Sequence, residues 1–143
     1  MLEAALEIAG VAMIAVEADG RLTHVNRHAR ALLGPGCMTV GSYPPAWVEE
    51  LQPRTASGVA LPLEDLPSVR ALCGEVVRAI DVLIALPGGD VLLEASARPA
   101  NDRRGRRRGA VVTLKDVTEL RRLEGRMRAP EWTPWRAAGD GGA

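Results

Sequence analysis

Residues 11–34 constrain the fold more than any other part of the chain. They read V-A-M-I-A-V-E-A-D-G-R-L-T-H-V-N-R-H-A-R-A-L-L-G, and the compact apolar run over residues 11–16 predicts a strand. Asp19 and Gly20 predict a tight hairpin turn, because glycine tolerates the positive φ that such turns require. Residues 21–25 predict the return strand, so this part of the chain is expected to form a β-hairpin.

A helix is expected directly after this hairpin, and further helices before the next strands. Asn26 can cap the first helix by accepting a backbone N–H bond, and Gly34 ends it. Proline and glycine residues interrupt regular structure over residues 35–60, and a short helix around residues 47–51 stays open there. Asp65 is a suitable cap for another helix, which runs to about Cys73. The middle of the chain is therefore predicted to hold helices and loops.

The second half of the chain predicts three more strands, over residues 76–86, 90–98 and 109–115. The last of them closes on Asp116-Val117-Thr118, and a helix follows it. With the first hairpin, these strands can form one five-stranded antiparallel sheet whose one face is covered by the middle helices. The predicted fold class is therefore α+β.

Four segments are expected along the chain. Leu2, Ala5, Leu6 and Ala9 recur at helical spacing and predict an amphipathic N-terminal helix. The segments are this helix over residues 1–10, a core domain over 11–116, an exit helix over 117–128, and a disordered tail over 129–143.

Composition and charge argue against several classes of function. The formal net charge is zero, which is untypical of a nucleic-acid-binding protein. No apolar run approaches the ~18 residues that a membrane span needs. Cys37 and Cys73 show no metal-ligand spacing. We therefore expect a cytoplasmic protein with reduced thiols, without a nucleic-acid partner, a membrane partner or a metal.

Three motifs, spaced in the expected order, resemble the PAS domain, a small bacterial sensory module. They are D-G-R-L-x-x-V-N with a helix ending L-L-G, then L-P-L-E-D-L-P-S-V-R-A-L-C-G-E, then G-A-V-V-T-L-K-D-V-T-E. The resemblance covers roughly residues 8–128. It implies the PAS fold and a non-enzymatic role in sensing and protein association, with no catalytic residue. PAS domains differ widely in what they bind, so the resemblance does not name a ligand.

The resemblance allows two cofactor classes to be compared with the chain. A haem-binding PAS domain usually presents a histidine from the helix before the last three strands, and residues 62–75 contain none; His24 and His28 lie near the first hairpin instead. The flavin photosensor type needs a cysteine in the pattern G-x-N-C-R-F-L-Q, which neither Cys37 nor Cys73 occupies. Haem and flavin are therefore disfavoured, and the protein is expected to be colourless.

A cavity with aliphatic walls is expected between the sheet and the helices. The chain has no Phe and one Tyr, so its apolar residues are mainly Ala, Val and Leu. Aliphatic walls suit an apolar or weakly polar ligand. We predict the lining residues of the cavity from the strand positions expected to face inward and from the apolar faces of the helices. They are Met13, Val25, Leu33, Leu72, Leu83, Leu93, Val112 and Leu114.

In the PAS family, the junction between the last strand and the exit helix couples the sheet to the output. Thr118 or Asp116 is expected to cap the exit helix, and Asp116 is expected to pair with Arg98 of the neighbouring strand. These three residues are the predicted signal junction.

The two terminal helices are the predicted self-association surfaces. Each is too short to be stable alone, because isolated helices below ~12–15 residues are marginal in water. Each must bury its apolar face, and a symmetric homodimer is the simplest arrangement. The predicted contact residues are Leu2, Leu6, Leu120 and Leu123.

Two other functions stay open beside a ligand-binding sensor. One is a ligand-free dimerisation scaffold of a larger signalling protein, such as a kinase, a phosphatase or a transcription regulator. The other is a small enzyme on a PAS-like or cystatin-like sheet, although no spacing singles out an acid–base pair. The arginine-rich run over residues 103–108 is interpreted as a solvated hairpin tip.

Overall fold

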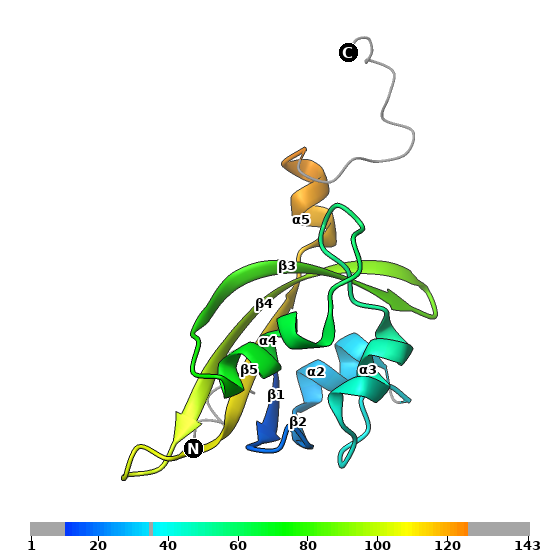
Figure 1. Ribbon diagram of the computed structural model, residues 1–143. Helices are drawn as coiled ribbons and strands as arrows, with labels where there is room; N and C mark the ends of the chain where they lie inside the picture. The colour runs from blue at the N-terminus through cyan, green and yellow to red at the C-terminus, as the bar shows by residue number, and fades with distance from the viewer. Residues whose placement is uncertain (1–10, 35, 126–143) are drawn as a thin grey trace, which may run out of the picture.

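The computed structural model of the chain describes residues 11–34 and 36–125. It contains a five-stranded antiparallel sheet in the order β2-β1-β5-β4-β3, which confirms the predicted α+β fold class (Figure 1). The strands are β1 (Ala12–Glu17), β2 (Leu22–Val25), β3 (Val77–Leu86), β4 (Gly89–Asn101) and β5 (Arg107–Asp116). The helices are α2 (Arg27–Leu33), α3 (Pro44–Leu51), the short 3₁₀ helix η1 (Leu63–Asp65), α4 (Pro67–Leu72) and α5 (Thr118–Leu123).

The first hairpin and its helix form for the local reasons that the sequence predicts. Gly20 has a φ of 94°, and its N–H donates to the Glu17 carbonyl at 2.8 Å. Asn26 caps α2, because its side-chain oxygen accepts from the Ala29 N–H at 2.9 Å. The same oxygen accepts from the Met13 N–H at 3.0 Å, so the cap also ties the helix to strand β1.

The long strands β3, β4 and β5 make up most of the sheet. Strand β5 pairs with both β4 and β1, and so joins the two halves of the sheet. Gly109 permits a close approach of β1 and β5, because a Cβ at this position would lie 2.1 Å from the Val16 carbonyl oxygen. Any other residue at position 109 would force these strands apart.

A bulge in β3 keeps the apolar residues of that strand on the inner face. The register with β4 shifts between Val77 and Ile80. Inside the bulge, Ala79 has a φ of 48°, and its N–H donates to Ser96 Oγ at 3.0 Å. Because of the extra residue, Val77 and Ile80 both pack toward the core although they are an odd number of positions apart.

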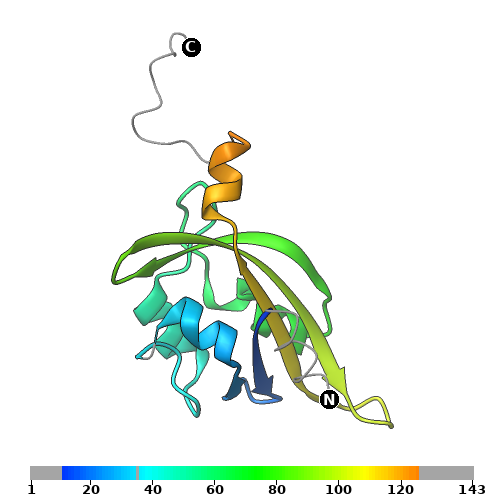
Figure 2. The same ribbon diagram turned by 180° about the vertical axis from the view of Figure 1, so that it is seen from behind.

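Helices α2, α3 and α4 cover the concave face of the sheet, while α5 rises on the opposite side (Figures 1 and 2). Pro44 stands in the first turn of α3, where the missing N–H costs no hydrogen bond. The helix places Trp47 and Leu51 in the core. The layers are therefore three helices on one face of a single curved sheet, with the exit helix on the other.

Two helix starts differ from the sequence prediction. Asp65 does not cap α4: it belongs to η1, and α4 follows Leu66 without a side-chain cap. Pro67 begins α4, where its fixed φ suits the first helical position. The exit helix begins at Thr118 rather than at residue 117.

Some predicted segments lie outside the described residues. These are the N-terminal helix over 1–10, the part of the exit helix beyond residue 125, and the tail over 129–143. Within the part of the chain that the structure describes, no helix is both long and apolar enough to cross a membrane.

Candidate functional site

A small apolar cavity lies between the sheet and the helices, with a volume of about 80 Å³. Four strands form one wall, and α2, α3, the start of α4 and the loops around them form the other. The lining residues are Ile14, Leu33, Met38, Trp47, Leu51, Pro53, Leu66, Pro67, Ser68, Val82, Ile84, Leu93, Ala95, Val112 and Leu114.

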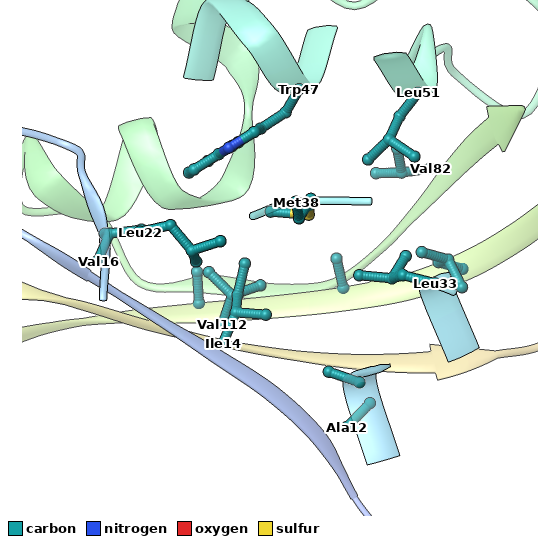
Figure 3. Close-up of a cluster of buried hydrophobic side chains, with 14 of the residues drawn as sticks. Ala12, Ile14, Val16, Leu22, Leu33, Met38, Trp47, Leu51, Val82 and Val112 are labelled. Carbon is teal, nitrogen blue, oxygen red and sulfur yellow. The ribbon is translucent and has the colours of Figure 1, made fainter. Parts of the chain in front are cut away.

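Met38 and Trp47 close the cavity on the helix side. Figure 3 shows Met38 between Trp47 of α3 and the sheet residues Ile14 and Val112. The indole Nε1 of Trp47 donates to Ser42 Oγ at 2.8 Å. Because this polar atom has its partner outside the cavity, the indole presents only an apolar surface to the interior.

Polar contacts hold the loop that carries Met38. Its φ is 52°, and its N–H donates to Glu50 Oε1 at 3.1 Å. Arg30 Nη1 donates to the Cys37 carbonyl at 2.8 Å. Burial, followed by the nearby Glu50 carboxylate, raises the pKa of the Cys37 thiol to about 11, so this thiol stays protonated at neutral pH and is a poor nucleophile.

The lining of the cavity restricts what can bind in it. Among the described lining residues, only Ser68 and Trp47 carry a polar side-chain atom, and none is charged. A charged ligand would lose its hydration there without gaining a partner. The volume of about 80 Å³ also lies well below the ~300–1,000 Å³ of pockets for drug-sized molecules, so neither haem nor a flavin fits this cavity. In the described residues, no group of three or more His, Cys, Asp or Glu side chains is placed to hold a metal ion.

The structure places only some of the predicted cavity residues in the wall. Those that line the cavity are Leu33, Leu93, Val112 and Leu114. Val25 and Leu72 are half-buried against the core but do not reach the cavity. Val25 is the last residue of the edge strand β2, and Leu72 is the last residue of α4.

The prediction for Met13 and Leu83 was wrong, because both lie on the face of the sheet that points away from the cavity. Their neighbours Ile14 and Val82 point inward in their place. Strand β1 is apolar at consecutive positions, so its sequence does not show which parity is inward. The sequence of β3 does show which side is outward, because the charged Asp81 is expected to face solvent. Leu83 lies two positions later and therefore points to the same side.

The sequence analysis missed the contribution of the segment between α2 and α4. Met38, Trp47 and Leu51 all come from this segment, for which the sequence predicts loops and leaves open a short helix around residues 47–51, the region of α3. Trp47 was the available signal, because a large aromatic residue in a short apolar helix is usually well buried. The cavity wall is therefore not purely aliphatic.

At the predicted signal junction, strand β4 binds the start of the exit helix. The Val117 N–H donates to the Leu92 carbonyl at 2.9 Å, and the Leu92 N–H donates to Thr118 Oγ1 at 2.9 Å. Asp116 Oδ1 accepts from the Thr118 N–H at 2.9 Å. The N-cap position itself is occupied by Val117, so neither Asp116 nor Thr118 is the capping residue. Instead, the Asp116 and Thr118 side chains accept backbone hydrogen bonds on either side of Val117.

The predicted pair between Asp116 and Arg98 is wrong. In the β4–β5 ladder, Arg98 lies opposite Val111, whereas Asp116 lies opposite Leu93. The antiparallel register therefore separates Arg98 from Leu93, the partner of Asp116, by five positions along the ladder.

Arg121 of α5 makes the ion pairs at this end of the sheet. Its Nε and Nη2 donate to the two carboxylate oxygens of Asp81, each at 3.1 Å, and its Nη2 also donates to Glu94 Oε2 at 2.8 Å. The Arg121 side chain is only 8% exposed. Hydrogen bonds with Asp81, and next with Glu94, raise the pKa of the guanidinium above its usual range. We call Arg121, Asp81 and Glu94 the exit-helix triad; the sequence analysis did not identify it.

Two of the predicted association residues lie in the exposed part of α5. Leu120 is 43% exposed and Leu123 is 76% exposed. Leu2 and Leu6 lie outside the described residues.

The arginine-rich run forms the β4–β5 turn and is partly structural. Asp102 accepts from the backbone N–H groups of Arg104 and Arg106, and these bonds lower its pKa. Arg107 Nη1 donates to the Leu72 carbonyl at 2.6 Å, which ties the turn to α4.

Comparison with known proteins identifies the fold. The family model described as the PAS fold matches residues 6–122. The structure is similar to the PAS domain of an HTR-like protein from Haloarcula marismortui, with 21% identity, 80% of this chain and 88% of that chain covered, and a TM-score of 0.53. It is also similar to the PAS domain of nitrogen regulation protein NR(II) from Vibrio parahaemolyticus, with 16% identity, coverage of 81% and 97%, and a TM-score of 0.54. The corresponding values for the PAS domain of the fruit-fly ELK potassium channel are 10% identity, coverage of 82% and 94%, and a TM-score of 0.54.

A search of curated proteins gives no match. At these identities, the likeness to solved structures concerns the fold alone. The family match, in contrast, extends over most of the chain, from before β1 into α5. Together with the sheet order and the placement of the helices, it shows that this chain belongs to the PAS family, whose members are sensory and signalling modules.

Proposed function

We propose that the chain is a sensory PAS domain that binds a small apolar molecule in its core cavity and passes the signal on through α5. The observation that carries this proposal is the cavity of about 80 Å³ with an uncharged lining. Its walls come from both the sheet and the helices, so an occupant would touch the two layers at once. A molecule bound there would therefore alter how these layers pack.

Thermal unfolding of the full chain with benzene or xenon tests this proposal. Both molecules enter an apolar cavity of ~150 Å³. Because this cavity is smaller, at about 80 Å³, xenon, the smaller of the two molecules, is the primary probe. Binding to the folded state raises the melting temperature as the probe concentration rises. The matched control is Ala95→Leu, which fills the cavity from its β4 wall and should abolish the response. An equal response in both chains would place the binding elsewhere.

A ligand-free scaffold within a larger signalling protein is the second candidate. The size of the cavity favours it, because about 80 Å³ is below the usual size of a ligand pocket. If the wild-type chain responds to none of the probes, and its unfolding is also unchanged by small molecules extracted from the producing cells, the scaffold becomes the better account. An enzyme is less well supported, because the cavity wall carries no acid–base pair.

We also propose that the chain forms a symmetric homodimer through its terminal helices. The exposure of Leu123, at 76%, supports an apolar contact at α5. Light scattering on the full chain and on Leu123→Asp tests the proposal. Val40→Asp, at a position 51% exposed and away from α5, is the control. A monomer at high concentration, or a dimer unaffected by Leu123→Asp, would contradict the role of α5.

We propose a cytoplasmic location and partners that are proteins rather than nucleic acid or membrane. The zero net charge supports this choice of partner. A gel-shift assay with duplex DNA and a vesicle-sedimentation assay should both show no binding at physiological salt.

A further inference from the structure

The outer face of the sheet carries two carboxylates in direct opposition. Asp81 of β3 lies opposite Glu94 of β4 in the ladder. Like charges at opposed positions on one face destabilise a sheet. Arg121 is placed to cancel this repulsion, because it contacts both carboxylates at distances of 2.8–3.1 Å.

The Arg121 side chain is more deeply buried than that of the neighbouring arginine of the helix, Arg122. The side chain of Arg121 is 8% exposed, whereas that of Arg122 is 47% exposed and pairs only within the helix, with Glu119 at 3.2 Å. Asp81 and Glu94 are themselves 21% and 30% exposed. A hydrogen-bonded cation between two half-buried carboxylates is screened less by salt than a surface pair.

Apolar burial anchors α5 only at its start, where Val117 is 1% exposed. Further along the helix, Leu120 is 43% exposed and Leu123 is 76% exposed. The helix is attached at its start, where Val117 and Thr118 bond to Leu92. Beyond that point, in the described residues, Arg121 links the helix to β3 and β4 through Asp81 and Glu94, and it is therefore placed to set the orientation of the helix over the sheet.

The same two strands line the cavity with their alternate residues. Val82 follows Asp81 and points into the cavity, and Leu93 and Ala95 flank Glu94 and also point into it. The triad and the cavity are therefore on opposite faces of one backbone layer. Any displacement of β3 relative to β4 by an occupant of the cavity changes the spacing of the two carboxylates.

We propose that the exit-helix triad is an ionic latch that couples the β3–β4 pair at the core cavity to the orientation of α5. A change in strand spacing opens the bridge from Arg121 to one carboxylate, and α5 is released to a partner. The proposal rests on the proposed function for the nature of the input, and it assigns Arg121 as the positioning residue of the output helix.

Amide hydrogen exchange of residues 118–125 in the full chain tests the latch. Arg121→Gln should accelerate exchange in this segment by about tenfold or more, because the hydrogen-bonded charge that holds the helix is lost. Arg122→Gln is the matched control, since it removes the same charge one residue away. Equal exchange in the two variants would overturn the latch.

A second variant separates the latch from a requirement for folding. Arg121→Gln alone leaves two opposed carboxylates without a cation and can unfold the chain. The triple variant Asp81→Asn, Glu94→Gln and Arg121→Gln has nearly the same shape and leaves no charge within the triad; Glu124, whose carboxylate lies 3.6 Å from Arg121 Nη1 in the wild type, is unchanged in it. We expect it to keep wild-type exchange in β3 and β4 while α5 exchanges faster. If the triple variant unfolds, or if it protects α5 as the wild type does, the latch is wrong.

The coupling to the cavity is tested by Ala95→Val, which adds bulk to the cavity wall beside Glu94. It should change α5 exchange in the wild-type background and leave it unchanged in the triple variant. No change in either background, with probe binding retained, would refute the latch. A change that needs Arg121, in a chain that binds no apolar probe, would refute the ligand-binding function and keep the latch.

Discussion

The two faces of the sheet are built on the same strands but are held by different forces. The inner face packs apolar residues of β1, β3, β4 and β5 against α2, α3 and α4. Figure 3 shows part of this core, including Ile14, Val82 and Val112 of the sheet with Leu33 and Trp47 of the helices. The outer face of β3 and β4 holds α5 through the buried Val117 at its start, through hydrogen bonds and through the charged triad. Because strand side chains alternate, a single pair of strands serves both faces.

This difference indicates that the inner face stabilises the domain, whereas the outer face sets the position of α5. Apolar burial is non-directional and grows with the area removed from water. A buried ion pair contributes little net stability, since desolvation offsets its attraction, but it demands a defined geometry. We therefore expect changes on the inner face to alter the stability of the domain most, and changes on the outer face to act mainly on α5.

The largest loss of stability is expected for Ile14→Ala on the inner face. Ile14 is 4% exposed and lines the cavity, so its truncation enlarges an existing void. Substitutions of this kind cost about 2–5 kcal/mol, which corresponds to a fall in melting temperature of about 10 °C or more. The control is Val59→Ala at a position 63% exposed, which should change stability by less than ~0.5 kcal/mol. Similar losses in both variants would contradict the assignment of the inner face.

The next largest effect is expected for Asn26→Ala, where the inner face meets the edge of the sheet. The Asn26 side chain accepts from Met13 and Ala29 and donates to the Val11 carbonyl at 2.8 Å. Its loss removes a cap and leaves buried backbone groups without partners, at a cost of about 2–4 kcal/mol. Urea denaturation should place Asn26→Asp between wild type and Ala, because Asp keeps both accepted bonds. If Asp and Ala lose the same amount, these bonds contribute nothing.

A smaller effect is expected at the start of α5. Thr118→Val removes the oxygen that accepts from the Leu92 N–H, which should cost about 1 kcal/mol. Thr118→Ser keeps this oxygen and is the matched control. Chemical denaturation gives the loss of stability, and exchange of the Leu92 amide should rise in the Val variant alone. A rise in both variants would show that the methyl group, not the oxygen, is important.

The smallest effect is expected for Arg98 on the outer face. Because the register separates it from Asp116, a double-mutant cycle of Arg98→Ala and Asp116→Ala should give a coupling within ~0.3–0.5 kcal/mol of zero. Arg98→Ala alone should change stability by less than ~0.5 kcal/mol. A coupling of about 1 kcal/mol or more would be typical of a charge-assisted hydrogen bond. It would support the Arg98–Asp116 pair that the sequence suggests.

Features that depend on neighbouring residues could be predicted well. The Asp19-Gly20 turn, the Asn26 cap and the three long strands follow from turn chemistry, capping and alternation. The order of these elements was enough to indicate a PAS fold. The cavity was predicted less well: Leu93 and Val112 were placed correctly, whereas Met13 was assigned to the wrong face because β1 is apolar on both parities.

The local pattern of residues in this chain thus determined its elements, their order and its family. Only the tertiary structure decided the inward parity of β1, the role of Trp47 in the cavity wall, and the partner of the outer carboxylates. Asp81, Glu94 and Arg121 are separated by up to 40 positions, and their meeting depends on strand register and on the direction in which α5 leaves β5. Register and direction arise from the packing of the whole sheet, and no short stretch of sequence contains them.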